Sequence, residues 1–183
     1  PQHTSRSFPT GINGLFGRHS FLTRVFPNNP WSRRYLMTDA PPRDGPYPVE
    51  QVSAACMLFP RALVAEVGPW DERYFAYWVD TAWCWRVRSQ GWPIYCIPAA
   101  RVTHHESNRP DRPKSLLRIW LFHSGALRFY RTSRRFGWLD PRVWVALLGL
   151  TLRGLFQLVQ STWMRWRIAW SRRATTTPGP VPK

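Results

Sequence analysis

Acidic side chains are scarce in this chain, which has 10 Asp and Glu against 26 Lys and Arg and a formal net charge of +16. The imbalance lies mainly in the second half, because residues 101–183 hold sixteen basic and three acidic residues. A basic surface of this kind favours an anionic partner, either nucleic acid or anionic lipid. The arginine-rich codon usage of a GC-rich genome is an alternative origin that implies no partner.

Cysteine is also rare, and Cys56, Cys84 and Cys96 show no close CxxC spacing. This argues against a zinc site or a disulfide framework, and we expect three reduced thiols in the core. The sequence lacks a Gly-rich phosphate loop, HExxH, GxSxG and acidic-x-acidic motifs. Its first twenty residues lack the apolar run of a signal peptide. The start at Pro1 in place of Met leads us to expect a further part upstream.

Regular elements are expected only after the first 48 residues, which are rich in Pro, Gly, Asn and Arg and predict an irregular, linker-like segment. The apolar run from Gln51 to Phe59 predicts a buried strand that ends at Pro60. The elements expected next are helices over 61–67 and 79–90 that end at Gly68 and Gly91, a strand over 92–97 and an extended piece over 101–104. Residues 49–113 therefore predict half of an α/β layer structure.

Two helices are expected in the basic second half. Residues 114–136 predict a basic amphipathic helix with a broad apolar face. Three of its arginines are spaced so that they share one side: Arg128, Arg131 and Arg135. Within residues 137–173 a longer helix is expected to start at Pro141, with Asp140 as its N-cap. The Thr- and Pro-rich tail, 174–183, is expected to be disordered.

The longer helix carries one narrow polar stripe on a mostly apolar rod. At about 100° per residue, the members of the stripe fall within about 80° of one another: Arg142, Gly149, Arg153, Gln157, Gln160 and Arg167. A transmembrane span needs about 20 uninterrupted apolar residues, and Arg153 interrupts the run. We therefore predict a helix that lies in the membrane interface, with Trp and Arg at the headgroups. Packing against a missing domain or another copy of the chain is the alternative.

Two places in the sequence could carry chemistry. Asp80 opens the predicted helix at 79–90 directly after an aromatic cluster. A carboxylate at a helix N-terminus is stabilised by the dipole and the free N–H groups, and it can act as a general base on a sugar hydroxyl. From these residues alone, a simple N-cap is the favoured role. His104 and His105 suit a metal or diphosphate, or form an ordinary surface pair.

Five separated blocks carry a resemblance to a known family. They are VSAACMLFPR at 52–61, VGPWDERYF at 67–75, YWVDTAWCWR at 77–86, GW at 91–92 and VTH at 102–104. In this order they resemble family-2 glycosyltransferases, and most of all the bacterial rhamnosyltransferase branch that builds cell-wall and surface polysaccharides. The resemblance covers about residues 27–136.

The resemblance implies a partial GT-A fold, its acceptor-side half, followed by amphipathic C-terminal helices. It implies that Asp80 is the base of a single displacement that inverts the anomeric carbon. By the same matching, the residues that would bind substrate are Ser53, Ala54, Trp78 and Arg86. His104 would contact a metal or the diphosphate. The complete enzyme would use Mg²⁺ or Mn²⁺ with a nucleotide-binding half outside this chain, and no metal is expected for this chain alone.

Three positions depart from the family pattern: Ala54 stands for a usual Gly, Val79 for a Glu and Ala82 for a second acidic residue. The implied function is transfer of a sugar, rhamnose in this branch, from a nucleotide sugar to a glycan or lipid-linked acceptor. The expected location is peripheral, on the cytoplasmic face of an anionic membrane. The alternative is a catalytically inactive, membrane-associated module. Nucleic acid is not expected as a partner, because the arginines interleave with bulky apolar residues.

Overall fold

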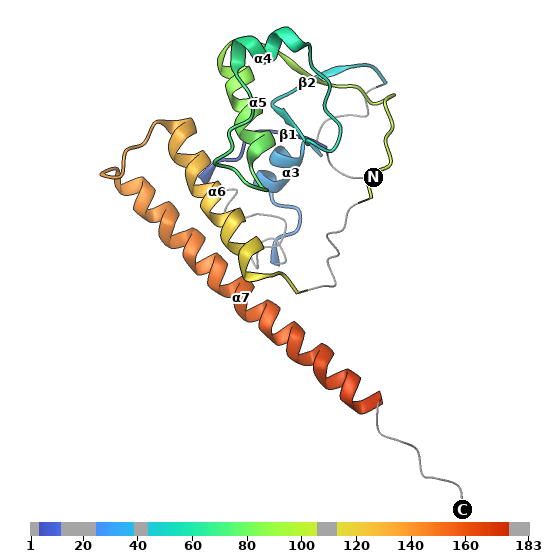
Figure 1. The fold of residues 1–183 in the computed structure, drawn as a ribbon, viewed down its shortest axis with the longest axis vertical. Helices are drawn as coiled ribbons and strands as arrows, with labels where there is room; N and C mark the ends of the chain where they lie inside the picture. The colour runs from blue at the N-terminus through green and yellow to red at the C-terminus, as the bar shows by residue number, and fades with distance from the viewer. Residues whose placement is uncertain (1–3, 12–24, 39–43, 106–112, 176–183) are drawn as a thin grey trace, which may run out of the picture.

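Two parts make up the described structure, a small mixed body and a long helical hairpin beside it (Figure 1). The computed structural model describes residues 4–11, 25–38, 44–105 and 113–175. Helices predominate over a few short strands, which is compatible with the expected α/β class. The body holds all the strands of the described residues, and the hairpin consists of helices α6 and α7.

The strands form two separate two-stranded antiparallel sheets. Strand β1 (Ser5–Arg6) pairs with β3 (Gln51–Val52), and β2 (Tyr47–Val49) pairs with β4 (Ile94–Cys96). The strand predicted over 92–97 is confirmed as β4. The strand predicted over 51–59 is wrong beyond its first two residues, because the chain turns after Val52 and leaves Leu58 98% exposed. The extended piece predicted over 101–104 forms no regular element.

The first 48 residues are more regular than their composition predicts. They contain β1, part of β2 and helix α3 (Pro30–Leu36). The Asn29 side-chain oxygen accepts a hydrogen bond of 2.8 Å from the Ser32 N–H, and Pro30 occupies the first turn. Both are ordinary helix-start signals. The prediction of an irregular segment is therefore wrong for these residues, while 1–3, 12–24 and 39–43 lie outside the described part.

The core of the body lies between helices α4 (Arg61–Val67) and α5 (Val79–Ser89). Four buried side chains form it: Leu63, Val67, Trp83 and Val87. The Trp83 indole N–H donates to the Gly68 carbonyl at 3.0 Å, at the point where α4 ends. Gly68 has a φ of 84°, a conformation that side chains disfavour. Both predicted helices and this glycine end are confirmed.

The three cysteines are free, but they do not share one environment. Cys84 is 1% exposed, and burial raises the pKa of its thiol to about 11. Cys96 is half-buried and Cys56 is exposed. The expectation of three core thiols is therefore wrong for Cys56, which lies in the turn region that replaces the predicted strand.

Helices α6 (Leu116–Arg134) and α7 (Pro141–Thr175) run antiparallel and correspond to the two helices predicted from the second half (Figure 1). Asp140 accepts a 2.9 Å hydrogen bond from the Arg142 N–H at the start of α7, as the capping signal predicts. At the other end α7 includes the first two residues of the tail expected to be disordered. The rest of that tail, 176–183, lies outside the described residues.

Helix α7 is long and apolar enough, by length and composition, to cross a membrane between Pro141 and Ser171. Only 11% of its most apolar stretch is buried within the molecule. The sequence analysis disfavours a span because Arg153 interrupts the apolar run. Helix α7 nevertheless meets the criterion of length and composition with Arg153 included. Whether α7 lies in the interface or crosses the bilayer is therefore not decided by composition.

Candidate functional site

Asp80 lies in the first turn of α5 and joins that helix to the turn that follows β3. Its Oδ1 accepts a 2.8 Å hydrogen bond from the Thr81 N–H, and its Oδ2 accepts one of 3.3 Å from the Ala54 N–H. The N-cap position belongs to Trp78, whose φ is 70° and whose side chain forms no capping bond. The interpretation of Asp80 as a simple N-cap is therefore wrong. The carboxylate instead bridges two segments that are 26 residues apart.

A buried polar pair next to Asp80 links the start of α5 to strand β3. The Thr81 hydroxyl donates to the Gln51 side-chain oxygen at 2.6 Å, and Gln51 is only 3% exposed. A paired polar group of this kind is stabilising only while both partners stay in place, because an unpaired buried amide is costly. Sequence reasoning missed this pair, since a Gln in a strand and a Thr in a helix carry no joint signal.

Asp80 itself is half-buried, so a substrate hydroxyl can reach it. Among the described residues, its hydrogen bonds come from backbone N–H groups and from no Lys or Arg. The positive end of the α5 dipole also faces it. The structure thus brings together Asp80 and Ala54 of the predicted site, with Ser53 next to them. The Ser53 hydroxyl accepts a 3.4 Å hydrogen bond from the Ala55 N–H within the same turn.

Trp78 is placed away from this turn, against helix α6. Its indole N–H donates to the Phe122 carbonyl at 2.9 Å, and its ring stacks on Phe129 with centroids 5.7 Å apart. A Cβ on Gly125 would lie only 2.8 Å from the Trp78 ring, so the glycine permits this close packing. Through these contacts Trp78 packs the start of α5 against helix α6 of the hairpin. Its predicted role in substrate binding stays a prediction.

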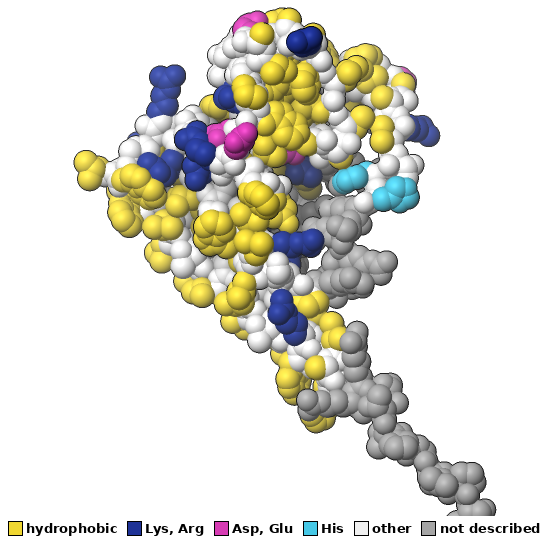
Figure 2. Space-filling view, in the orientation of Figure 1, with side chains coloured by type: hydrophobic (Ala, Val, Ile, Leu, Met, Phe, Trp, Pro, Cys, Tyr) yellow, Lys and Arg dark blue, Asp and Glu magenta, His cyan; other side chains and the backbone are white. Residues whose placement is uncertain are grey.

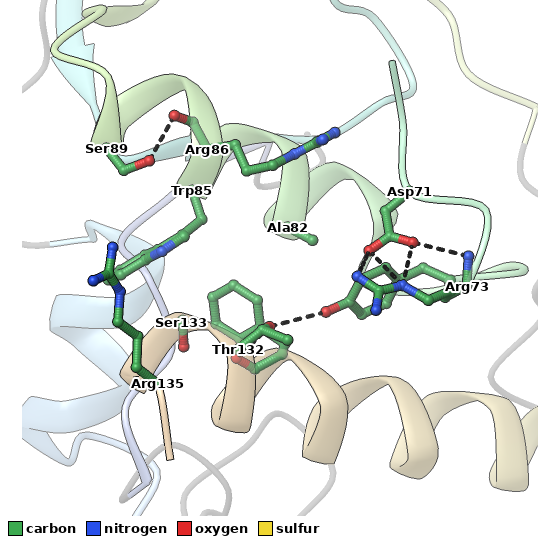
Figure 3. Close-up of a pocket in the computed structure, with 11 residues that line it drawn as sticks. Asp71, Arg73, Ala82, Trp85, Arg86, Ser89, Thr132, Ser133 and Arg135 are labelled. Atoms are coloured by element: carbon green, nitrogen blue, oxygen red, sulfur yellow. Dashed lines mark hydrogen bonds and ion pairs between the residues drawn. The ribbon is translucent and has the colours of Figure 1, made fainter. Parts of the chain in front are cut away.

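Arg86 lines a separate pocket of about 340 Å³ between α5 and α6 (Figure 3). Two further guanidinium groups, Arg73 and Arg135, line it together with the aromatic rings of Trp85 and Tyr74. Asp80 is not among its lining residues. The predicted site residues are therefore divided between two places, the turn beside Asp80 and this cationic pocket.

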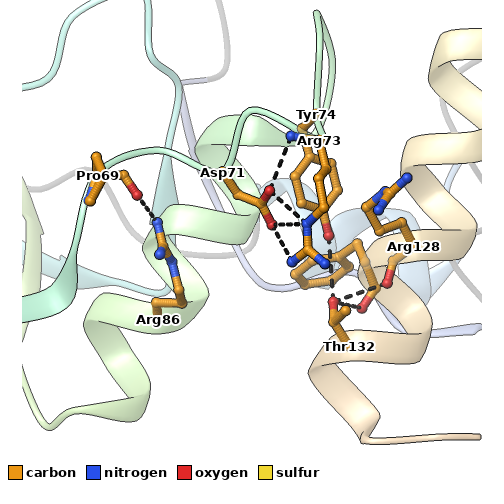
Figure 4. Close-up of polar contacts among 8 residues, drawn as sticks. Pro69, Asp71, Arg73, Tyr74, Arg86, Arg128 and Thr132 are labelled. Atoms are coloured by element: carbon orange, nitrogen blue, oxygen red, sulfur yellow. Dashed lines mark hydrogen bonds and ion pairs between the residues drawn. The ribbon is translucent and has the colours of Figure 1, made fainter.

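Two arginines of the pocket, Arg73 and Arg86, already interact with neighbouring groups of the protein (Figure 4). Arg73 forms an ion pair of 2.7 Å with Asp71, and this neighbour holds the pKa of the Asp71 carboxyl below its usual range. Arg86 donates to the Pro69 carbonyl, while its Nε is buried without a partner in the described structure. Burial raises the pKa of Tyr74, whose hydroxyl lies 3.4 Å from that of Thr132. The pocket therefore favours an anionic group.

The three arginines predicted to share one side of α6 do turn towards the body and the hairpin loop. Arg128 lies 5.9 Å from the Tyr74 ring centroid, Arg131 lies 3.6 Å from that of Trp138, and Arg135 lines the pocket. Only Arg135 of the three lines the pocket, so their spacing indicated a single residue of its α6 wall. On the other wall the motif block indicated Arg86, whereas Arg73 and Tyr74 were not indicated as site residues.

His104 is exposed on the segment that follows β4. Among residues 4–11, 25–38, 44–105 and 113–175, no three His, Cys, Asp or Glu side chains gather where they could hold a metal ion. The structure thus does not bring His104 together with other metal-binding side chains in its described part. Its predicted contact with a metal or diphosphate stays a prediction.

The sequence is similar to that of a known mycobacterial enzyme. Over 171 residues, or 93% of this chain, it is 33% identical to the N-acetylglucosaminyl-diphospho-decaprenol L-rhamnosyltransferase of Mycobacterium tuberculosis, in both strain CDC 1551 / Oshkosh and strain ATCC 25618 / H37Rv. The chain spans about half the length of these curated relatives, 52%. No protein-family model and no solved structure matches it. The likeness supports a rhamnosyltransferase-like chain, in agreement with the motif blocks.

Proposed function

We propose that this chain is the acceptor-side, base-bearing part of an inverting glycosyltransferase with a GT-A fold. The observation that carries the proposal is the 33% identity to the mycobacterial rhamnosyltransferase along 93% of the chain. The transferred sugar is proposed to be rhamnose, donated by a nucleotide sugar. The proposed acceptor is a lipid-linked glycan, such as the N-acetylglucosaminyl-diphospho-polyprenol class named for that relative. Its place is the cytoplasmic face of the membrane, as a peripheral protein.

Asp80 is the proposed general base. Its carboxylate takes the proton of an acceptor hydroxyl, whose oxygen then attacks the anomeric carbon of the sugar. The new glycosidic bond forms as the bond to the diphosphate breaks, and the nucleoside diphosphate leaves on the opposite face. The N–H groups of Ala54 and Thr81 support this role because they fix the carboxylate at the end of α5. A fixed base in reach of the hydroxyl contributes through both position and proton transfer.

The cationic pocket supports a second part of the proposal, the binding of an anionic substrate group by Arg86. A guanidinium with a buried, unpartnered Nε could donate a charge-assisted hydrogen bond from this group to a phosphate oxygen. Ser53 and Ala54 are proposed to contact the acceptor, because their turn lies beside Asp80. Trp78 would contribute through the position of α5, since its ring packs on α6.

A divalent metal, Mg²⁺ or Mn²⁺, is proposed for the complete enzyme. The described residues do not by themselves fit such a metal, because they gather no cluster of three ligand side chains. The two Asp80 oxygens are also already bonded to backbone N–H groups. The steps proposed here therefore use only the residues of this chain.

The alternative is a catalytically inactive, membrane-associated module. The observation that favours it is the loss of two acidic side chains beside Asp80, where Val79 and Ala82 stand. Fewer carboxylates leave less hydrogen-bonding capacity for an acceptor hydroxyl. The two functions differ in whether the native protein transfers sugar at all.

The test is sugar transfer by the full native polypeptide that contains these residues, from nucleotide-activated rhamnose to an N-acetylglucosaminyl-diphospho-polyprenol. We expect Asp80→Asn to lower kcat by about 10²–10⁴-fold, the usual contribution of a general base. Glu72→Gln is the matched control, because it removes an exposed carboxylate that lies neither in the turn beside Asp80 nor among the residues that line the cationic pocket, and it should keep turnover within about threefold. Equal turnover of Asp80→Asn and the native enzyme would exclude Asp80 as the base. No transfer by the native protein would favour the inactive module.

A further inference from the structure

Beyond Val143, which is fully buried near its start, helix α7 has the reverse of the usual arrangement of polar and apolar side chains. On the side that packs against α6 and the body, Gln157 is 5% exposed and Ser161 is 7% exposed. On the opposite side Leu148 is 61% exposed and Val159 is 67% exposed. The middle of the polar stripe, at Arg153 and Gln157, therefore faces the protein, while Arg142 and Arg167 at its two ends are exposed. An amphipathic helix in water would instead turn its apolar stripe inwards.

The outward side is apolar along almost the whole helix. Its members recur at spacings of three and four residues, which places them on one face: Leu148, Leu152, Leu155, Val159, Trp163, Trp166 and Trp170. We call these residues the outer face of α7. The exposed side chains of Leu116, Leu117 and Trp120 add to the apolar surface of the hairpin on α6. Figure 2 shows hydrophobic side chains along the hairpin.

Polar contacts hold the inward side of α7 against Lys114, just before α6, and against Phe122 of α6. The Ser161 hydroxyl accepts a 3.2 Å hydrogen bond from the Lys114 N–H, and Arg165 donates to the Lys114 carbonyl at 3.2 Å. The Arg153 guanidinium lies 5.5 Å from the Phe122 ring centroid. These contacts fix the rotation of α7 about its axis. The apolar outer face is thus a fixed feature of the hairpin.

The charge of the hairpin indicates what covers this face. Residues 113–175 contain twelve Lys and Arg but one acidic residue, Asp140, which is paired with Arg142 at 2.7 Å. A second copy of the hairpin would bring arginines together without carboxylates between them, which is unfavourable. An anionic lipid leaflet supplies both an apolar layer and a row of phosphates.

The arginines of α7 are placed to reach such phosphates. At about 100° per residue, Arg142 and Arg167 lie roughly 100° to one side of the centre of the outer face, and Arg165 lies roughly 110° to the other. Arg167 also lies 4.8 Å from the Trp163 ring centroid. Basic groups on both flanks of an apolar face are the arrangement of a helix that lies in the plane of the interface.

A spanning orientation fits these contacts less well. Helix α6 runs beside α7, from Lys114 next to Ser161 to Arg131 next to Trp138. If α7 crossed the bilayer in this arrangement, α6 would have to enter it too, with four arginines: Arg118, Arg128, Arg131 and Arg134. Charged side chains inside the hydrocarbon are costly.

We propose that the outer face of α7 lies in one leaflet of an anionic membrane, with the axis of the helix parallel to the surface. This inference deepens the peripheral location proposed above and does not depend on sugar transfer, because lipid binding needs no donor. The apolar side chains enter the acyl boundary and the flanking arginines contact the lipid phosphates. The body then stays on the aqueous side, held by the inward side of the hairpin.

The test is cosedimentation of the 183-residue chain with vesicles of phosphatidylcholine alone or mixed with phosphatidylglycerol. We expect binding to the anionic vesicles and weaker binding to the neutral ones. The double variant Leu152→Gln/Val159→Gln should weaken binding by about 10- to 100-fold, because two side chains of the outer face become polar. Thr151→Gln/Thr162→Gln is the matched control, with the same new side chains at two exposed positions that are already polar, and it should bind within about twofold.

Four results would overturn the proposal. The first is an equal effect of the two double variants, and the second is the absence of binding to anionic vesicles. The third is retention of the chain in the vesicles after an alkaline carbonate wash, which indicates a span. Sedimentation of the chain as a dimer that the Leu152→Gln/Val159→Gln variant dissociates would assign the face to a second copy instead. Thermal melts of both variants should match the native melt, since all four side chains are exposed.

Discussion

The body and the hairpin differ in how much of their apolar surface they leave exposed. In the body, Trp83 is 3% exposed and Val87 is 2% exposed, so apolar burial holds α4 against α5. In the outer half of the hairpin, Gln157 is buried while Val159 two residues later is 67% exposed. Burial of apolar area favours folding by about 25 cal/mol per Å² only where that area leaves water. The hairpin therefore keeps much of its apolar area available for another partner.

The two parts also differ in charge. Residues 44–105 contain six acidic side chains and five arginines, so the body is almost neutral. Residues 113–175 contain twelve basic side chains against one acidic. The hairpin therefore carries most of the net charge of the whole chain, +11 of +16. A basic charge that is concentrated in the part with the exposed apolar face points to one surface with two complementary contacts.

The comparison is tested most strongly by removing one tryptophan from each part. Trp83→Ala should lower the free energy of unfolding by about 3–5 kcal/mol, because it leaves a cavity in the core and a Gly68 carbonyl without its donor. Trp166→Ala on the outer face should cost about 1 kcal/mol or less in water, since its ring is 60% exposed and, among the described residues, stacks on the ring of Trp170 alone. Urea unfolding measures both. A similar loss in both variants would mean that the outer face packs within the molecule.

The contact between the two parts is tested by a pair of glycines. A Cβ on Gly125 would lie 2.8 Å from the Trp78 ring and 3.4 Å from the Tyr77 carbonyl. Gly125→Ala should therefore lose on the order of 1 kcal/mol, because the clash outweighs the gain in helix propensity. Gly149→Ala meets no atom within 4 Å and should gain up to about 1 kcal/mol. Thermal melts give both signs, and stabilisation by both substitutions would show that Trp78 can move aside without loss.

Helix ends were the part of the fold that could be predicted from the sequence. Gly68 and the Asp140–Pro141 pair mark their helices because the capping interaction is local. The same logic applies to Asn29 and Pro30, where the surrounding composition concealed it. The sheets could not be predicted, because Ser5 pairs with Val52 across 47 residues and each strand is only two or three residues long. Such pairings depend on the packing of α5 and not on the strand residues.

The candidate site shows the same limit. The sequence indicated a carboxylate at the start of a helix, and the motif blocks indicated Ser53 and Ala54 as site residues within a predicted strand. The turn that replaces this strand, and the bond between Asp80 and the Ala54 N–H, appear only in three dimensions. Trp78 is the opposite case. Its motif block predicts contact with substrate, but in the structure its ring packs on α6, which lies later in the chain. For α7, a helical wheel finds the polar stripe but carries no information on which side faces the protein.

A smaller effect is expected from His123, which sits where the polar inward side of the hairpin meets α6. Its Nδ1 lies 2.6 Å from the Ile119 carbonyl, so this nitrogen donates its proton. Its Nε2 is buried without a partner in the described structure. Burial lowers the pKa of this imidazole, and the nearby charges of Arg153 and Lys114 lower it further. The neutral ring is thus the form that the hairpin accommodates.

The sign of the pH dependence follows from that lowered pKa. Below the ordinary value of 6.5, the unfolded chain binds a proton at His123 that the folded chain resists, so the contribution of this residue to stability is complete above that value and is lost as the pH falls. Between pH 7.5 and 5.5 we expect the native chain to lose up to about 2–4 °C more in Tm than His123→Gln, which has no proton to take up. Equal pH dependence of the two melts would mean that water enters the joint between α6 and α7. The buried polar side chains of the hairpin would then be hydrated, and the outer face of α7 would no longer have the fixed orientation that distinguishes this part from the body.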